Sequence, residues 1–114
     1  MCHVLIIEDE PLIALNIQMM LEDAGATSFD IAATEGDAVD AAIARRPDVI
    51  TSDVALLLGT GPRAVQTIHD RLGPLPVIFI TATPKDCEPC PAPAIVISKP
   101  FPAKQLVDAF RKVM

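Results

Sequence analysis

Short apolar runs alternate with longer amphipathic stretches along almost the whole chain, and this alternation limits its possible folds more than any other feature. The apolar runs predict five strands, within "HVLIIED" (3–9), "SFDIAAT" (28–34), "DVITSD" (48–53), "LPVIFIT" (75–81) and "AIVIS" (94–98). The stretches between them carry apolar residues at helical spacing. Strands that alternate with helices predict a parallel sheet with helices on both faces and right-handed crossovers.

Four helices are predicted, over 11–24, 36–46, 62–72 and 102–114. Pro11 suits the first turn of the first helix, Gly25 suits its C-terminal cap, and Pro47 marks the end of the second. The apolar residues at helical spacing are Leu12, Leu15, Met19 and Met20 in the first helix, Ala38, Ala41, Ala42 and Ile43 in the second, Val65, Ile68 and Leu72 in the third, and Leu106, Val107, Phe110 and Val113 in the last.

Length and charge exclude several classes of protein. The 114 residues suffice for one domain with a buried core but not for two independent domains, so we expect a single domain over 1–114 with no second module attached. A net charge of −6 argues against nucleic acid or an anionic membrane as partner, because both require clustered Lys and Arg. The N-terminal apolar run is too short for a secretory signal or a membrane span, which predicts a cytoplasmic protein with reduced cysteines.

Polar residues gather where the predicted strands end. They are Glu8, Asp9 and Glu10 after the first strand, Asp53 at the end of the third, Thr81 after the fourth and Lys99 after the fifth. Ligands of open α/β sheets bind outside the carboxyl ends of the strands. Carboxylates that converge there repel one another unless they hold a cation, and Mg²⁺ prefers such oxygen ligands. A carboxylate nucleophile beside Mg²⁺, a hydroxyl and a lysine is suited to accepting a phosphoryl group.

The chain resembles the receiver domains of two-component response regulators. The matching segments are "VLIIEDEP" (4–11), "DVITSDV" (48–54) with Gly61 beyond it, "PVIFITA" (76–82) and "SKPF" (98–101). Each segment is weak evidence alone, but all four occur in order on the expected strands. The resemblance implies a flavodoxin-like, doubly wound sheet of five strands in the order 2-1-3-4-5.

The resemblance also implies a role for each polar residue. Asp53 would be the phosphoacceptor and would share the Mg²⁺ with Asp9, a direct ligand, with Glu8, which acts through water, and with the backbone carbonyl of Ala55. Alternatives for single residues remain open, since an acidic cluster at a strand end is commonly just solvated.

Two further residues would serve the response to phosphorylation. Thr81 resembles the hydroxyl residue that moves onto the phosphoryl oxygen, and Lys99 the residue that pairs with it. The Lys99–Pro100 peptide bond would be cis, which proline makes accessible.

The chain departs from the family pattern at three places. Leu57 stands where a proline is usual, and Val96 stands where many receivers have Tyr or Phe. The segment "TPKDCEPCPAPA" (83–94) carries four prolines where receivers have their fourth helix, so we expect that helix to be absent or reduced to a proline-rich loop. A zinc or redox role for Cys87 and Cys90 is the weaker interpretation, because too few further ligands are available.

These observations predict a single-domain response regulator. A histidine kinase or histidine phosphotransfer protein would phosphorylate Asp53, and the protein would then switch a protein partner that the sequence does not identify. We expect a signalling switch and not an enzyme. Two alternatives stay open, a pseudo-receiver that works without phosphorylation and a small aspartyl-phosphate phosphatase, although Ala55 stands where such phosphatases have a second Asp. Homodimerisation also stays open, because receivers often pair.

Overall fold

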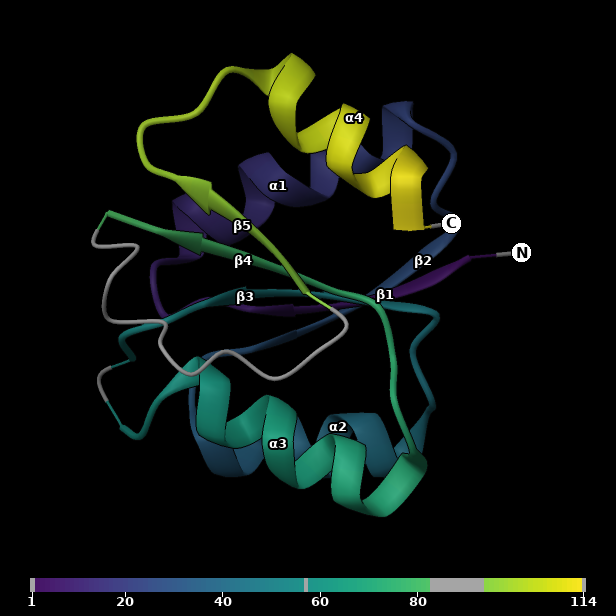
Figure 1. Ribbon diagram of the computed structural model, residues 1–114, viewed down its shortest axis with the longest axis vertical. Coiled ribbons are helices and arrows are strands. Elements are labelled where there is room, and N and C mark those ends of the chain that lie inside the picture. The colour runs from purple at the N-terminus through teal and green to yellow at the C-terminus, as the bar shows by residue number, and fades with distance from the viewer. Residues whose placement is uncertain (1, 57, 83–93, 114) are drawn as a thin grey trace.

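The computed structural model describes residues 2–56, 58–82 and 94–113 and contains one five-stranded sheet (Figure 1). The strands are β1 (His3–Ile7), β2 (Ser28–Ala32), β3 (Val49–Asp53), β4 (Val77–Thr81) and β5 (Ala94–Ser98). Every neighbouring pair is parallel, and the order is β2-β1-β3-β4-β5. The predicted doubly wound, flavodoxin-like fold is therefore confirmed.

Four helices cover the sheet in the described part of the chain: α1 (Pro11–Asp23), α2 (Glu35–Ala44), α3 (Gly61–Leu72) and α4 (Ala103–Val113). Figure 1 shows α1 and α4 on one face of the sheet and α2 and α3 on the other. The expected loss of a helix within 83–93 falls outside the described residues, as do the expectations for Leu57, Cys87 and Cys90. None of the described helices is long and apolar enough to cross a membrane.

The core has two apolar layers because successive side chains of a strand point to opposite faces of the sheet. Val4 and Ile6 of β1 face α1 and α4, where Leu21 and Phe110 are fully buried. Leu5 and Ile7 face α2 and α3. The second layer also contains Ala38, Ala42, Ile50, Val65, Ile68, Val77 and Phe79. Since β1 is buried along its whole length, it can expose functional groups only at its ends.

The apolar repeat in α1 predicted the helix correctly, but of its four residues only Met20 packs against the core. Leu12, Leu15 and Met19 are 82%, 49% and 58% exposed, whereas Ala14, Ile17 and Leu21 are buried. α1 is apolar on most of its circumference, so two overlapping series fit the helical period. The series that contains the small residue Ala14 packs against the sheet. Ile43 of α2 is likewise exposed, at 46%.

Threonine side chains cap α2 and α3. The Thr34 hydroxyl accepts a hydrogen bond from the Asp37 N–H at 3.1 Å, and the Thr60 hydroxyl accepts one from the Arg63 N–H at 3.3 Å. The capping at Thr60 fixes where α3 begins, and therefore how the loop after β3 returns to the sheet.

Candidate functional site

An acidic cluster lies at the carboxyl ends of β1 and β3, which are neighbours in the sheet. Glu8 and Asp9 follow β1 directly, and Asp53 is the last residue of β3. One carboxylate oxygen from each residue lies within 4.8 Å of the other two. Glu8 is only 3% exposed, so the cluster is partly buried.

Lys99 reaches this cluster from the end of β5. Its Nζ atom lies 3.3 Å from Glu8 Oε1 and 3.2 Å from Asp53 Oδ2. Burial alone would lower the pKa of Lys99, but the negative charges of Asp53 and Glu8 outweigh it, and the net pKa is raised. The Lys99–Pro100 peptide bond is cis, as predicted.

Three carboxylates and one described lysine meet at this cluster, so negative charge exceeds positive charge, and the pKa of Glu8 is raised. Burial and then the charge of Asp53 raise it from 4.5 to about 7. The charge of Lys99 and a 3.3 Å hydrogen bond from the Glu10 N–H lower it without cancelling these effects. A bound cation would relieve the excess.

The end of β3 is tightly packed around Asp53. Asp53 Oδ1 accepts a hydrogen bond from the Val54 N–H at 2.8 Å, and the Ser52 hydroxyl donates to the Asp53 carbonyl at 2.8 Å. Gly61 lies directly over this point, where a Cβ atom would overlap the Asp53 carbonyl oxygen and Ser52 Oγ. Only glycine fits at position 61, because the backbone of the loop returns so close to the strand.

The remaining predicted site residues lie at the same edge of the sheet. Thr81 ends β4, is 2% exposed, and its carbonyl accepts a hydrogen bond from the Lys99 N–H at 2.8 Å. Ala55 lies in the loop after β3 and forms an isolated antiparallel bridge with Thr60.

The donor atoms fit a hard divalent cation. Carboxylate oxygens are the ligands that Mg²⁺ prefers, and three of them converge here. Lys99, which contacts two of them, carries only one positive charge. The acidic cluster could therefore hold a metal ion.

The arrangement and the sequence agree with one known family. The family model for the response regulator receiver domain matches residues 4–111. The chain belongs to this family. Receivers are signalling switches of two-component systems.

Several similar proteins carry the name PhyR. The receiver is 39% identical over 104 residues to the phyllosphere-induced regulator PhyR of Methylorubrum extorquens, a match that covers 87% of this chain and 38% of that protein. The solution structure of the PhyR receiver domain of Erythrobacter litoralis aligns with a TM-score of 0.88 at 31% identity, and covers 98% of this chain and 88% of that one.

A crystal structure of a mutant of the anti-anti-sigma factor PhyR from Bartonella quintana aligns with a TM-score of 0.84 at 33% identity, and covers 98% of this chain and 48% of that one. This receiver thus spans less than half the length of two of these PhyR proteins, the one from Methylorubrum and the one from Bartonella.

Sequence patterns do not single out Glu35, although it contacts the loop that follows Asp53. Glu35 Oε1 accepts a hydrogen bond from the Thr60 N–H at 3.1 Å. The two residues are distant in sequence. In the sequence alone, Glu35 is an ordinary acidic residue in the first turn of α2. Only the packing of α2 beside this loop gives it a contact near the site.

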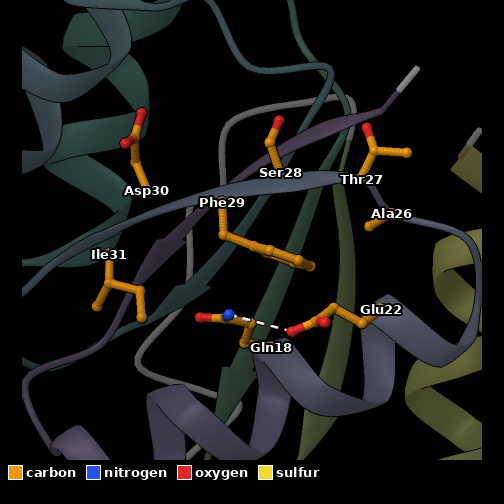
Figure 2. Close-up of a pocket in the computed structure, with 8 residues that line it drawn as sticks. All are labelled: Gln18, Glu22, Ala26, Thr27, Ser28, Phe29, Asp30 and Ile31. Carbon is orange, nitrogen blue, oxygen red and sulfur yellow. Dashed lines mark hydrogen bonds between the residues drawn. The ribbon is translucent and has the colours of Figure 1, made fainter.

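A pocket of about 450 Å³ lies between α1 and the edge strand β2. Figure 2 shows Phe29 and Ile31 pointing toward α1, where Gln18 and Glu22 are joined by a hydrogen bond, while Asp30 points away. None of the residues of the acidic cluster lines this pocket. The candidate site therefore remains the acidic cluster, which is separate from this pocket.

Proposed function

We propose that this receiver accepts a phosphoryl group on Asp53 from a histidine kinase or a histidine phosphotransfer protein. Glu8, Asp9, Asp53 and the carbonyl of Ala55 would hold the Mg²⁺ that the transfer requires. One observation carries the proposal: Lys99 lies within 3.3 Å of both Glu8 and Asp53, in an acidic cluster whose charge it does not balance.

The transfer forms one bond and breaks another. A carboxylate oxygen of Asp53 attacks phosphorus, the P–N bond to the donor imidazole breaks, and the electron pair of that bond stays on the nitrogen. The Val54 N–H restricts the rotation of the carboxylate by holding Oδ1. When bound, Mg²⁺ would supply positive charge that offsets the charge of the phosphoryl oxygens.

Lys99 and Thr81 serve the phosphorylated state. The Lys99 ammonium already points at Asp53 and would pair with a phosphoryl oxygen there. The Thr81 hydroxyl would donate to another phosphoryl oxygen, and its movement would change the surface at the ends of β4 and β5. Such a response needs two discrete arrangements that phosphorylation biases.

The downstream partner is a protein, and a regulator of sigma factors is the class to test first. The similarity to two PhyR proteins, one of which is described as an anti-anti-sigma factor, supports this choice. The receiver would act in the cytoplasm. Pairing of two copies after phosphorylation is a further part of the proposal, which sedimentation with and without beryllofluoride would test.

The phosphoacceptor is tested with acetyl phosphate and Mg²⁺, by intact-protein mass spectrometry. We expect the wild type to gain the mass of one phosphoryl group, and Asp53→Asn to gain none. Asp40→Asn, which removes an exposed carboxylate of α2, is the matched control and should react as the wild type does. A chelator should abolish the reaction.

The same experiment separates the two rival functions. A wild type that stays unmodified, and whose NMR spectrum does not respond to beryllofluoride, would be a pseudo-receiver. Repeated turnover of phosphoesters would identify a phosphatase.

A further inference from the structure

The two ends of the loop between β3 and α3 lie side by side next to Asp53. Ala55 and Thr60 form an antiparallel bridge, and the Gly61 N–H donates a hydrogen bond to the Val54 carbonyl at 2.9 Å. The two sides of the loop are therefore joined at its base. The position of the Ala55 backbone depends on the position of Thr60.

Glu35, the first residue of α2, holds this loop from outside through two hydrogen bonds. Its Oε1 atom accepts from the Thr60 N–H at 3.1 Å, and its own N–H donates to the Leu58 carbonyl at 3.1 Å. Arg63 Nε lies 3.8 Å from the same carboxylate oxygen, but its side chain is 76% exposed. The exposed ion pair contributes little, so the contact with the backbone of Thr60 is the one that matters.

Gly59 makes room for the Glu35 side chain. It has a φ of +87°, and a Cβ atom at this position would lie 2.5 Å from Glu35 Cβ and 2.6 Å from Glu35 Oε1. The chain therefore passes directly over the Glu35 side chain. Both the positive φ and the close approach require glycine.

We propose that Glu35 is a positioning residue of the phosphoacceptor site. By holding Thr60 it holds the bridged Ala55, whose carbonyl is a Mg²⁺ ligand in the proposed function, on which this inference rests. Glu35 itself contacts neither the metal nor the phosphoryl group. Loss of a residue that orients a metal ligand typically weakens metal binding by about tenfold or more.

If Glu35 acted only through its charge, its variants would differ in Mg²⁺ affinity in another order. Glu35 also adds a negative charge near the site, and that charge attracts a cation whether or not the loop is held. Glu35→Gln keeps the acceptor oxygen and loses the charge. Glu35→Asp keeps the charge but is one methylene shorter, and Glu35→Ala loses both.

The test measures the Mg²⁺ dissociation constant of these variants by calorimetry, and the hydrogen exchange of the Thr60 amide without metal. We expect Glu35→Ala and Glu35→Asp to bind Mg²⁺ about tenfold more weakly and to exchange the Thr60 amide faster, with Glu35→Gln close to the wild type. Asp37→Ala is the matched control, since Asp37 is an exposed acid in the same turn of α2.

Two results would overturn the inference alone. The first is Mg²⁺ affinity unchanged in both Glu35→Ala and Glu35→Asp. The second is equal weakening in Glu35→Gln and Glu35→Ala with Glu35→Asp as the wild type, which would indicate a charge effect. A wild type that binds no Mg²⁺ would instead overturn the proposed function, and this inference with it.

Discussion

The two ends of β1 both carry buried polar side chains, but the charges are arranged differently. At the amino end, the side chain of His3 is surrounded by Ser28 and Asp30 of β2. At the carboxyl end, Glu8 is surrounded by Asp53 and Lys99. Both clusters place an ionisable base beside a carboxylate.

The polar groups of the amino end satisfy one another. His3 Nδ1 lies 2.8 Å from Ser28 Oγ and His3 Nε2 lies 2.9 Å from Asp30 Oδ2. The His3 N–H donates to Asp48 Oδ2 at 2.8 Å, and Arg45 donates to Ser28 Oγ at 2.9 Å. Every polar atom of the His3 ring therefore has a partner, which is the normal state of a buried polar group.

The carboxyl end keeps an excess of negative charge, and burial and then the charge of Asp53 raise the pKa of Glu8 to about 7. Such an excess costs stability unless a ligand offsets it. The comparison shows that burial of polar groups does not by itself mark a functional site. A partly buried cluster with a shifted pKa is instead a candidate functional site, because such shifts gather where a ligand or a reaction uses the charge.

The largest expected effect follows from replacing Lys99 with Met. The change leaves the carboxylates of Glu8 and Asp53 without their cation, so we expect the free energy of unfolding at pH 8 without metal to fall by about 3 kcal/mol. Phosphorylation by acetyl phosphate should also slow. Urea denaturation followed by far-UV circular dichroism measures the first effect, because the chain has no Trp or Tyr.

Lys104→Met is the control for this variant, since Lys104 is an exposed lysine in the first turn of α4. Equal stability of Lys99→Met and Lys104→Met would show that the positive charge of Lys99 does not stabilise the carboxyl end of β1.

The second expected effect is a pH dependence of stability at the carboxyl end. Because folding raises the pKa of Glu8 from 4.5 to about 7, the folded state binds the proton more tightly than the unfolded state does. Stability without metal should therefore be highest below pH 4.5 as far as Glu8 is concerned, and should fall by roughly 2 to 3 kcal/mol as the pH rises to about 7.

Glu8→Gln should remove the pH dependence that Glu8 contributes. The measurement is the free energy of unfolding of the wild type and of Glu8→Gln as a function of pH. Saturating Mg²⁺ should weaken this pH dependence as well, since metal ligands must be ionised. Parallel curves for wild type and Glu8→Gln from pH 5 to 8 would contradict the assignment.

A smaller effect is expected at the amino end. His3→Ala removes the hydrogen bonds of a buried ring and leaves a cavity, so we expect a loss of about 2 kcal/mol in the free energy of unfolding. The Mg²⁺ affinity should stay the same, because this network is structural. A clear change in Mg²⁺ affinity of a folded His3→Ala protein would mean that the two ends of β1 are coupled.

The smallest effect is expected for Arg45→Ala. The hydrogen bond of Arg45 to Ser28 lies at the surface, so its loss should change the free energy of unfolding by about 0.5 kcal/mol or less. Thermal unfolding of Arg45→Ala, His3→Ala and the wild type under the same conditions measures the difference in stability. If Arg45→Ala were as destabilising as His3→Ala, the amino end would depend on charge as the carboxyl end does.

Much of the fold was predictable because it depends on local patterns. A strand that is buried on both faces is continuously apolar, as β4 is, and a helix has the apolar period of α3, whose Val65 and Ile68 are buried as predicted. The buried face of α1 was not predictable, because two apolar series fit the same helix. The series that packs against the sheet contains Ala14, whose small side chain allows close packing.

The sequence by itself determined which residues reach the carboxyl edge of the sheet. Glu8, Asp9, Asp53, Thr81 and Lys99 each end or follow a strand, and parallel strands end at the same edge. Which residues lie at this edge therefore follows from the order of residues along the chain.

Only the tertiary structure decided how these residues influence one another. The pKa of Glu8 depends on its burial and on the nearness of Asp53, which follows it by 45 positions, and the contact of Glu35 with Thr60 depends on α2 lying beside a distant loop. Electrostatic energies and hydrogen bonds vary with distances of a few ångströms. Such distances are set by packing, and no local pattern of residues encodes them.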